Sequence, residues 1–155
     1  MFVKDILKDK GNQVHVIKPE ALLSDAAGML VTHRIGALVV LNELGGIVGV
    51  VSERDIVRGT ATQKDRLWNV RVAELMSQNV RTCRPDDAIE DLMQVMTDER
   101  IRHLPVVDDD DRLIGLVSIG DVVKSRISAC DFENSQLKQY IVGDDLLAAT
   151  SREKH

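Results

Sequence analysis

The apolar and polar positions of the first half of the chain predict a short mixed unit of strands and helices. Residues 14–17 form an extended segment that is ended by Pro19. Two β-rich runs, 37–41 and 47–51, flank a hairpin signal at 42–46, and a further helix begins near Ser52. The order is therefore β-α-β-β-α. The first helix is predicted from apolar residues at helical spacing, namely Leu22, Leu23, Ala26, Ala27, Leu30 and Val31.

The same pattern occurs a second time. Residues 14–57 align with 80–123 at a shift of 66 without a gap, and 12 of the 44 pairs are identical. The preceding segments, 3–7 and 72–76, also match, but at a shift of 69, so the first copy carries three extra residues around 8–13. One copy of about 55 residues is too small to bury its sheet alone, and we expect the two copies to cover each other.

This repeat sets the predicted domain organisation. We expect a first repeat over 1–60, a linker over 61–71, a second repeat over 72–125 and a C-terminal helix and tail over 126–155. Trp68 of the linker is interpreted as a plug in the core between the copies. Residues 125–142 place Ile127, Leu137, Tyr140 and Ile141 among polar residues, which indicates a helix.

Composition narrows the function classes. The chain has 155 residues with 20 basic and 25 acidic side chains, and it lacks the run of apolar residues that a membrane span needs. The charged segment 1–10 is unlike a signal peptide, so we expect a cytoplasmic protein. Cys83 and Cys130 are predicted to be reduced thiols, with no metal site. A net charge of −5 and few aromatic residues argue against nucleic-acid binding.

The most informative string is Gly49-Val50-Val51-Ser52-Glu53-Arg54-Asp55, which returns as Gly115-Leu116-Val117-Ser118-Ile119-Gly120-Asp121. A strand runs into a helix, with Ser and Asp three residues apart at the junction. This spacing fits a helix capping box. It also fits nucleotide binding, because a helix N-terminus attracts phosphate and an Asp carboxylate can accept hydrogen bonds from ribose hydroxyls.

With this double motif, and with Arg102-His103-Leu104-Pro105-Val106-Val107 opening the middle strand of the second copy, residues 3–124 resemble a tandem cystathionine β-synthase (CBS) domain pair, also called a Bateman module. The resemblance implies an α/β (α+β) fold in which two repeats pack about a pseudo-twofold axis. It also implies two clefts for adenine nucleotides such as AMP, ADP, ATP or NAD, or for S-adenosylmethionine, and a homodimer.

The resemblance also implies site residues. Asp55 and Asp121 would hold ribose hydroxyls, and Ser52 and Ser118 would face ribose or phosphate. The remaining residues assigned to the clefts border the adenine or begin the following strands: they are Val16, Ile17, Lys18, Ala37, Thr82, Cys83, Arg84 and Pro105.

The two copies differ in charge. The first copy has Arg54 where the second has Gly120, and the second has Arg102 and His103 where the first has Gly36 and Ala37. We predict that each cleft draws its phosphate-binding charge from a different place, with AMP in one and NAD(H) in the other. His103 is either a packed polar residue or a phosphate ligand. Arg34 and Arg100 are interpreted as helix C-terminal residues.

Three function classes follow. The first is a regulatory protein that binds adenine nucleotides, senses energy or redox state and signals to an unknown partner by a change of shape. The second is a dimerisation scaffold with vestigial clefts. The third is an enzyme acting on a nucleotide or thiol, which lacks support because the sequence shows no Ser-His-Asp, P-loop or metal-ligand spacing. Residues 125–143 are interpreted as a cover over an apolar face, with partner contact as the alternative.

Overall fold

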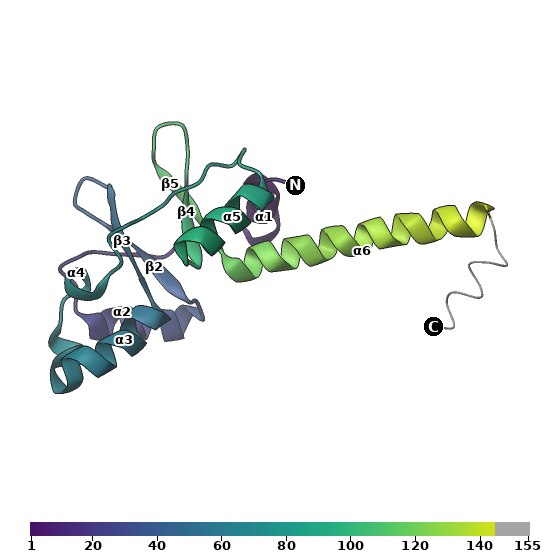
Figure 1. The fold of residues 1–155 in the computed structure, drawn as a ribbon. Coiled ribbons are helices and arrows are strands. Elements are labelled where there is room, and N and C mark those ends of the chain that lie inside the picture. The colour runs from purple at the N-terminus through teal and green to yellow at the C-terminus, as the bar shows by residue number, and fades with distance from the viewer. Residues whose placement is uncertain (145–155) are drawn as a thin grey trace.

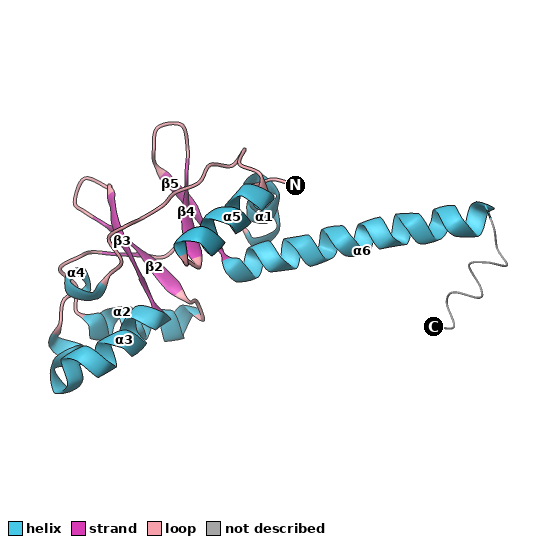
Figure 2. Ribbon diagram, viewed as in Figure 1, coloured by secondary structure: helices cyan, strands magenta, loops and turns pink. Residues whose placement is uncertain are grey.

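The computed structural model describes residues 1–144 and shows two similar α+β units followed by a long helix (Figures 1 and 2). The α+β class is confirmed, and the first repeat shows the predicted β-α-β-β-α order, whereas the second repeat lacks a regular first strand. The first part of the chain contains α1 (Val3–Lys10), β1 (Val16–Ile17), α2 (Leu23–His33), β2 (Ala37–Leu41), β3 (Ile47–Ser52), α3 (Glu53–Gln63) and the 3-10 helix η1 (Lys64–Asn69). The second part contains α4 (Val72–Leu75), α5 (Ile89–Glu99), β4 (His103–Val107), β5 (Leu113–Ser118) and α6 (Ile119–Asp144).

The two sheets share one register. In the first, β2 pairs antiparallel with β3, so that Leu38 lies opposite Val51; in the second, β4 pairs with β5, and Leu104 lies opposite Val117. Every aligned pair of the first hairpin has its counterpart 66 residues later, including the irregularity after Val40 and after Val106. The sequence repeat is therefore a structural repeat at the level of single residues.

The two sheets differ in their first segment, which is a regular strand in the first repeat and a single bridge in the second. In the first repeat, β1 runs parallel to β2, and the N–H of Val39 donates to the carbonyl of His15 at 3.2 Å. The counterpart of Val39 is Pro105, which has no N–H to donate. The pairing shrinks to a single bridge between Cys83 and Val106. One proline therefore explains why the second sheet is reduced to two regular strands.

Each repeat is completed by the helix that precedes the other repeat. The N–H groups of Val3 and Lys4, at the start of α1, donate to carbonyls of the second repeat, those of Asp87 and Pro85, at 3.0 and 2.9 Å. The equivalent N–H groups at the start of α4 donate to Ala21 and Pro19 of the first repeat, at 2.8 and 3.0 Å. The packing units therefore cross the boundaries at 60 and 72 that the sequence repeat suggests.

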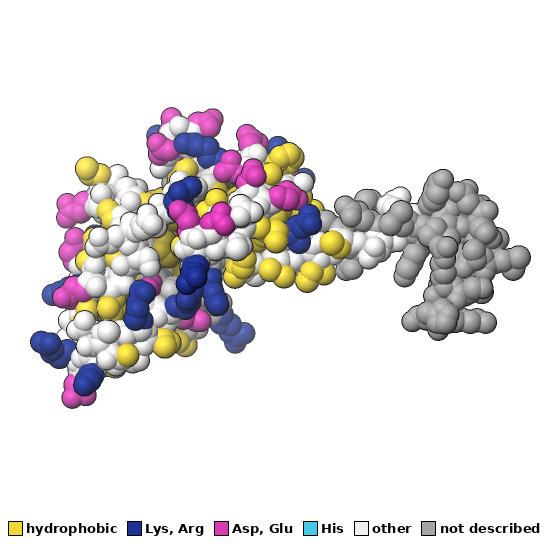
Figure 3. Space-filling model, in the orientation of Figure 1, with side chains coloured by type: hydrophobic (Ala, Val, Ile, Leu, Met, Phe, Trp, Pro, Cys, Tyr) yellow, Lys and Arg dark blue, Asp and Glu magenta, His cyan; other side chains and the backbone are white. Residues whose placement is uncertain are grey.

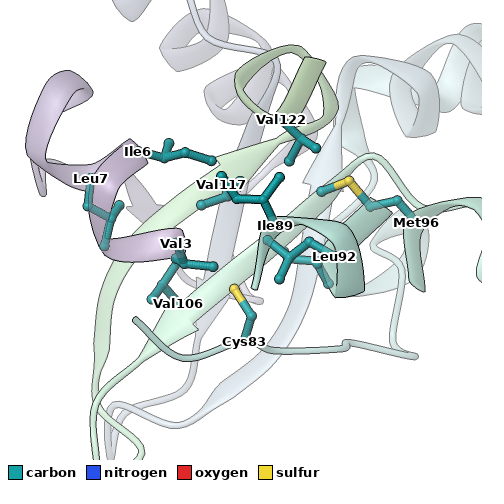
Figure 4. Close-up of a cluster of buried hydrophobic side chains, with 11 residues drawn as sticks. Val3, Ile6, Leu7, Cys83, Ile89, Leu92, Met96, Val106, Val117 and Val122 are labelled. Carbon is teal, nitrogen blue, oxygen red and sulfur yellow. The ribbon is translucent and has the colours of Figure 1, made fainter. Parts of the chain in front are cut away.

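The two hydrophobic cores follow the same exchange. Val3, Ile6 and Leu7 of α1 pack into the core of the second repeat, where Figure 4 shows Ile6 pointing toward Val117 and Val3 lying beside Val106. The first repeat receives Leu67 of η1 and Val72 of α4, packed with Leu23, Ala26, Leu30, Leu38 and Val51. Burying these apolar side chains removes them from water, so neither core is complete without the other half of the chain.

Two apolar residues lie differently from the sequence interpretation. Trp68 is 50% exposed, and its neighbour Leu67, 3% exposed, fills the core position instead. The prediction that Trp68 is a core plug is therefore wrong. Adjacent residues of a helical turn point in different directions, so only one of the two can face inward. For the same reason Val31 is exposed while Leu30 is buried.

The C-terminal segment is one uninterrupted helix with the motif helix of the second repeat. α6 begins directly after Ser118 and continues to Asp144, without a break near residue 125. Figure 1 shows most of it extending away from the two repeats, so the prediction that this segment covers an apolar face is wrong. The side chains of Leu137, Tyr140 and Ile141, and the tail from 145 to 155, lie outside the described part. Over residues 1–144, no helix has the length and apolarity to cross a bilayer.

The close approach of the segment after α4 to β3 gives a test of how the helix preceding one repeat packs on the other repeat. A Cβ at Gly49 would lie 2.9 Å from Met76 Cγ and 3.0 Å from the Ser77 carbonyl oxygen. We expect Gly49→Ala to lower the free energy of unfolding by about 1–3 kcal/mol, because the strand must move away from this segment. Gly28→Ala, on an open face of α2, should instead raise it by about 0.5–1 kcal/mol. Urea unfolding measures both, and equal effects would contradict the close packing.

Candidate functional site

A cavity of about 330 Å³ lies between the two repeats. The first repeat supplies Gly36 and Val50 together with the start of α3, from Ser52 to Arg58. The second supplies two segments, one between α4 and the Cys83 bridge and one between α5 and β4; they contribute Ser77, Asn79, Val80 and Arg81, and Arg100, Ile101, Arg102 and His103. The site is therefore shared by both repeats, and the motif of the first repeat forms one wall.

The Ser52–Asp55 motif forms a complete capping box. The backbone N–H of Ser52 donates to Asp55 Oδ2 at 2.9 Å, and the backbone N–H of Asp55 donates to Ser52 Oγ at 3.4 Å. These bonds satisfy free N–H groups at the start of α3. Asp55 is 3% exposed, and among the side chains that the structure describes it is the only buried charged one. The capping interpretation from the sequence therefore describes the geometry of this motif.

The second carboxylate oxygen of Asp55 is available for another role. Asp55 Oδ1 accepts hydrogen bonds from the Arg58 guanidinium and from Ser77 Oγ, the latter at 3.3 Å. All three residues line the cavity. One oxygen of Asp55 thus holds the helix, while the other holds two groups that a ligand hydroxyl could replace.

The cavity carries an excess of positive charge. Five arginines line it, against the two carboxylates of Glu53 and Asp55. Arg81 also pairs with Glu99 at 3.1 Å, and Arg58 pairs with Asp55. Figure 3 shows basic side chains gathered between the two repeats on one face. Guanidinium groups bind phosphate through paired N–H donors, so this wall is suited to an anion. The five are Arg54, Arg58, Arg81, Arg100 and Arg102.

His103 lies between the two Ser-x-x-Asp motifs. Its Nε2 would be 3.4 Å from a Cβ placed at Gly36, and its side chain lines the cavity. Burial lowers its pKa below the ordinary 6.5, and the Lys10 ammonium lowers it further, whereas Asp121 and, more weakly, Asp55 oppose the shift. The imidazole ring is thus close enough to interact electrostatically with the carboxylates of both repeats.

The motif of the second repeat has the same cap but a different neighbour. The N–H of Ser118 donates to Asp121 Oδ2 at 2.9 Å, and the N–H of Asp121 donates to Ser118 Oγ at 3.2 Å. Lys10 Nζ also donates to Asp121 Oδ2, at 2.7 Å. Burial alone would raise the pKa of Asp121, but the Lys10 and Ser118 hydrogen bonds outweigh it and hold that pKa below its ordinary value.

The predicted site residues separate into three groups. Five of them line the cavity: Ser52, Arg54, Asp55, Arg102 and His103. Ser118 and Asp121 form the second motif. The others lie outside this cavity: Ile17, Ala37, Cys83 and Pro105 are buried in or beside the sheets, and Val16, Lys18, Thr82 and Arg84 are exposed. Burial, with the Asp87 charge, raises the pKa of Cys83 to about 12, which fits an inert thiol.

The charge asymmetry takes another form than the sequence suggested. Arg54 and the Arg102–His103 pair were assigned to different clefts, and the structure brings them to one cavity. The start of β4 faces the motif of the first repeat, so a position in one repeat contributes to the site of the other. Arg58, Ser77, Arg81 and Arg100 were missed. Of these, only Arg58 had a sequence signal, because it lies one helical turn after Asp55.

Arg34 and Arg100 do end helices, as predicted. Each occupies the C-cap of its helix, α2 or α5, in the left-handed conformation, with φ of 54° and 55°. Only Arg100 lines the cavity. Within residues 1–144, no group of three or more His, Cys, Asp or Glu side chains is placed to hold a metal ion.

The lowered pKa of His103 predicts a specific loss of stability in acid. A histidine whose folded pKa lies below its unfolded value costs stability as the pH falls below 6.5, because the unfolded chain binds the proton more readily. We expect the Tm of the wild type to fall more between pH 7.5 and 5.5 than that of His103→Gln. The two should change in parallel above pH 7.5, and parallel curves throughout would contradict the buried environment. The carboxyl of Asp121 acts in another window, below about pH 4.

Comparisons with known proteins agree with the fold and with the repeat. The sequence profile of the family described as "CBS domain" matches residues 3–61 and 72–128. The crystal structure of the CBS-domain containing protein ATU1752 from Agrobacterium tumefaciens is 42% identical in sequence, with a TM-score of 0.77 over 81% of this chain and 92% of that one.

Two further solved structures contain ligands. The CBS domain pair of protein MJ0100, in complex with 5′-methylthioadenosine and S-adenosyl-L-methionine, is 29% identical, with a TM-score of 0.72 over 84% of this chain and 98% of that one. CBSX2 in complex with AMP is 29% identical, with a TM-score of 0.66 over 83% and 97%. With the family profile matched over most of its length, in two copies, this chain belongs to the CBS domain family.

Proposed function

We propose that this protein is a regulatory module that binds AMP, or a related adenine nucleotide, in the cavity between its repeats. The observation that carries the proposal is the buried Asp55, which presents one carboxylate oxygen to a cavity lined by five arginines. A carboxylate can accept hydrogen bonds from both ribose hydroxyls, and arginines neutralise a phosphate. The two chemistries, placed side by side, match the two polar ends of a nucleoside phosphate.

Binding would exchange one set of hydrogen bonds for another. Asp55 Oδ1 is held by Arg58 and Ser77 Oγ, and a ribose hydroxyl would take the place of the Arg58 contact. The Arg58 side chain is 63% exposed, so its displaced guanidinium can turn toward the phosphate. Because α3 begins at this motif, ligand binding would also change how α3 packs in the first repeat. This coupling is how we propose that occupancy is signalled to a partner.

Size and charge favour a mononucleotide. About 330 Å³ is near the lower end of the range for small-molecule sites, and this volume suits AMP better than a dinucleotide. The ligands of the two similar structures, AMP in one and 5′-methylthioadenosine and S-adenosyl-L-methionine in the other, share an adenosine group. Among these, AMP alone is an anion at neutral pH with a phosphate for the arginines. NAD(H) as a second ligand stays a prediction from the sequence.

The regulatory proposal extends to assembly. Apolar side chains remain exposed on several helices, including Val31 of α2, Val57 of α3 and Ile127 of α6. A contact between subunits would remove these side chains from water, which favours association. We propose a cytoplasmic homodimer that conveys energy or redox state to a separate target protein; its output is a change in contacts rather than a chemical reaction.

Nucleotide binding can be tested by thermal shift and calorimetry with AMP, ADP, ATP, NAD, NADH, 5′-methylthioadenosine and S-adenosyl-L-methionine. Ligands that bind only the folded state raise Tm by mass action. We expect AMP to raise Tm more than the two uncharged or cationic adenosine compounds. Asp55→Asn should weaken AMP binding by about tenfold or more, because a charged hydrogen-bond acceptor is lost.

The matched control is Asp25→Asn, since Asp25 lies in the first turn of α2 as Asp55 does in α3, but outside the cavity. This variant should bind AMP like the wild type. Absence of any shift with every compound would contradict the nucleotide proposal and favour a scaffold with vestigial clefts. Release of a new product from a bound nucleotide would instead indicate an enzyme.

A further inference from the structure

The second Ser-x-x-Asp motif is occupied by a side chain of the same protein. Lys10 Nζ donates to Asp121 Oδ2 at 2.7 Å and to the carbonyl oxygen of Leu116 at 2.8 Å. By the 66-residue repeat, Asp121 and Leu116 correspond to Asp55 and Val50, and both of these line the cavity of the first motif. The ammonium group of Lys10 therefore lies at the equivalent of the nucleotide cavity, on the carboxylate equivalent to Asp55.

The contact arises from the three extra residues of the first copy. In the first repeat, Val50 and Ser77 exchange backbone hydrogen bonds: Ser77 N–H donates to the Val50 carbonyl at 2.9 Å, and Val50 N–H donates back at 3.1 Å. Ser77 follows α4, which has only four residues. The helix in the corresponding place, α1, has eight and ends at Lys10. The added turn puts a lysine where the other repeat has a serine.

One ammonium group thus reaches the carbonyl and the carboxylate that correspond to the two partners of Ser77, but on Asp121 it binds Oδ2, the oxygen that also accepts the Ser118 N–H of the capping box. Ser77 uses its N–H for the Val50 carbonyl and its hydroxyl for Asp55. Lys10 uses a single Nζ for the Leu116 carbonyl and for Asp121. At the first motif, Ser77 and Asp55 line a cavity of about 330 Å³. At the second motif, the Lys10 ammonium instead forms an ion pair with the Asp121 carboxylate. The Lys10 side chain is 36% exposed and the Asp121 side chain 23%, so the pair is half-buried.

The rest of the second motif is also poorer in anion-binding groups. The counterparts of Arg54, Arg102 and His103 are Gly120, Gly36 and Ala37, which have no charged side chain to offer. A phosphate would therefore find fewer arginines here than in the first cavity. Of the five arginine positions, only those of Arg58 and Arg100 have cationic counterparts that are Lys or Arg, namely Lys124 and Arg34. The part of a nucleotide that depends least on such charges, its nucleoside, is therefore the ligand class that this motif favours once the lysine leaves.

We propose that Lys10 is an internal occupant of the Asp121 motif, which keeps a latent nucleoside site closed until the last turn of α1 releases the lysine. The inference rests on the proposed function in one respect, because it assigns the ribose-binding role of Asp55 to Asp121 as well. It predicts that the wild type binds one adenine nucleotide per chain, at Asp55, and that loss of the ammonium uncovers a second site.

The test uses isothermal titration calorimetry on the full chain with adenosine and AMP as probes. Asp55→Asn weakens binding in the first cavity, and Lys10→Met removes the ammonium while keeping most of the aliphatic chain. We expect the double variant to bind at least one probe at least tenfold more tightly than Asp55→Asn alone. Adding Asp121→Asn should abolish that gain, and Lys10→Arg, which keeps the positive charge, should not produce it.

Lys8→Met is the matched control, because it removes an equal charge from the same exposed end of α1 without touching Asp121. It should leave binding as in Asp55→Asn. Unchanged or weaker binding in the Lys10→Met double variant would overturn the proposal, and weaker binding would make Lys10 a ligand contact. AMP binding to the wild type is measured separately. The proposal of a nucleotide site at Asp55 and the proposal of a closed site at Asp121 can therefore be contradicted independently.

A second readout needs no ligand. The carboxyl carbon of Asp121 can be followed by NMR as the pH is lowered. Its pKa should lie below the ordinary value in the wild type, because Lys10 and Ser118 outweigh the effect of burial. In Lys10→Met it should rise, since burial then acts with less opposition. An equal pKa in both proteins would show that the lysine does not occupy the motif in solution and would overturn the proposal.

Discussion

The reciprocal placement of α1 and α4 is the constraint on which the rest of the structure depends. Each repeat of about 55 residues has a sheet with one face to cover. The helix that covers it is the one that precedes the other repeat in the sequence. The hydrogen bonds that join them are equivalent on the two sides, so that Leu23 N–H donates to Val70 at 2.8 Å and Ile89 N–H donates to Met1 at 3.1 Å. Both repeats must therefore fold together, and the space between them becomes a fixed part of the molecule.

The functional site uses a stabilising device for a second purpose. The Ser–Asp capping box holds the start of α3 and leaves one oxygen of Asp55 facing the other repeat. The same cap in the second repeat meets Lys10. The added turn of α1 relative to α4 thus changes the neighbour of an identical motif. Near-symmetry in the fold does not imply two equal sites, because the segments that cross between repeats differ.

Much of the fold followed from the sequence, because the evidence was local. Identical residues 66 positions apart predicted the strands, their order and the repeated motif, and the register matches residue by residue. The site was less predictable. Sequence comparison pairs a residue with its copy, whereas the cavity joins Arg54 to residues such as Arg102 that lie across the interface. The roles of Leu67, Trp68 and Lys10 depended on which way one turn faces, which spacing alone does not specify.

The length of α6 means that a movement at the second motif can displace atoms far from it. The helix begins at the residue after Ser118, contains Asp121 in its first turn and runs for 26 residues without interruption. At a rise of about 1.5 Å per residue, it is roughly 40 Å long. A helix that starts at a binding motif is a lever with its pivot at that motif. If it turns as a rigid rod, a tilt of about 5° at its first turn moves the far end by about 3.5 Å, so a small change at Asp121 becomes a larger displacement far from the repeats.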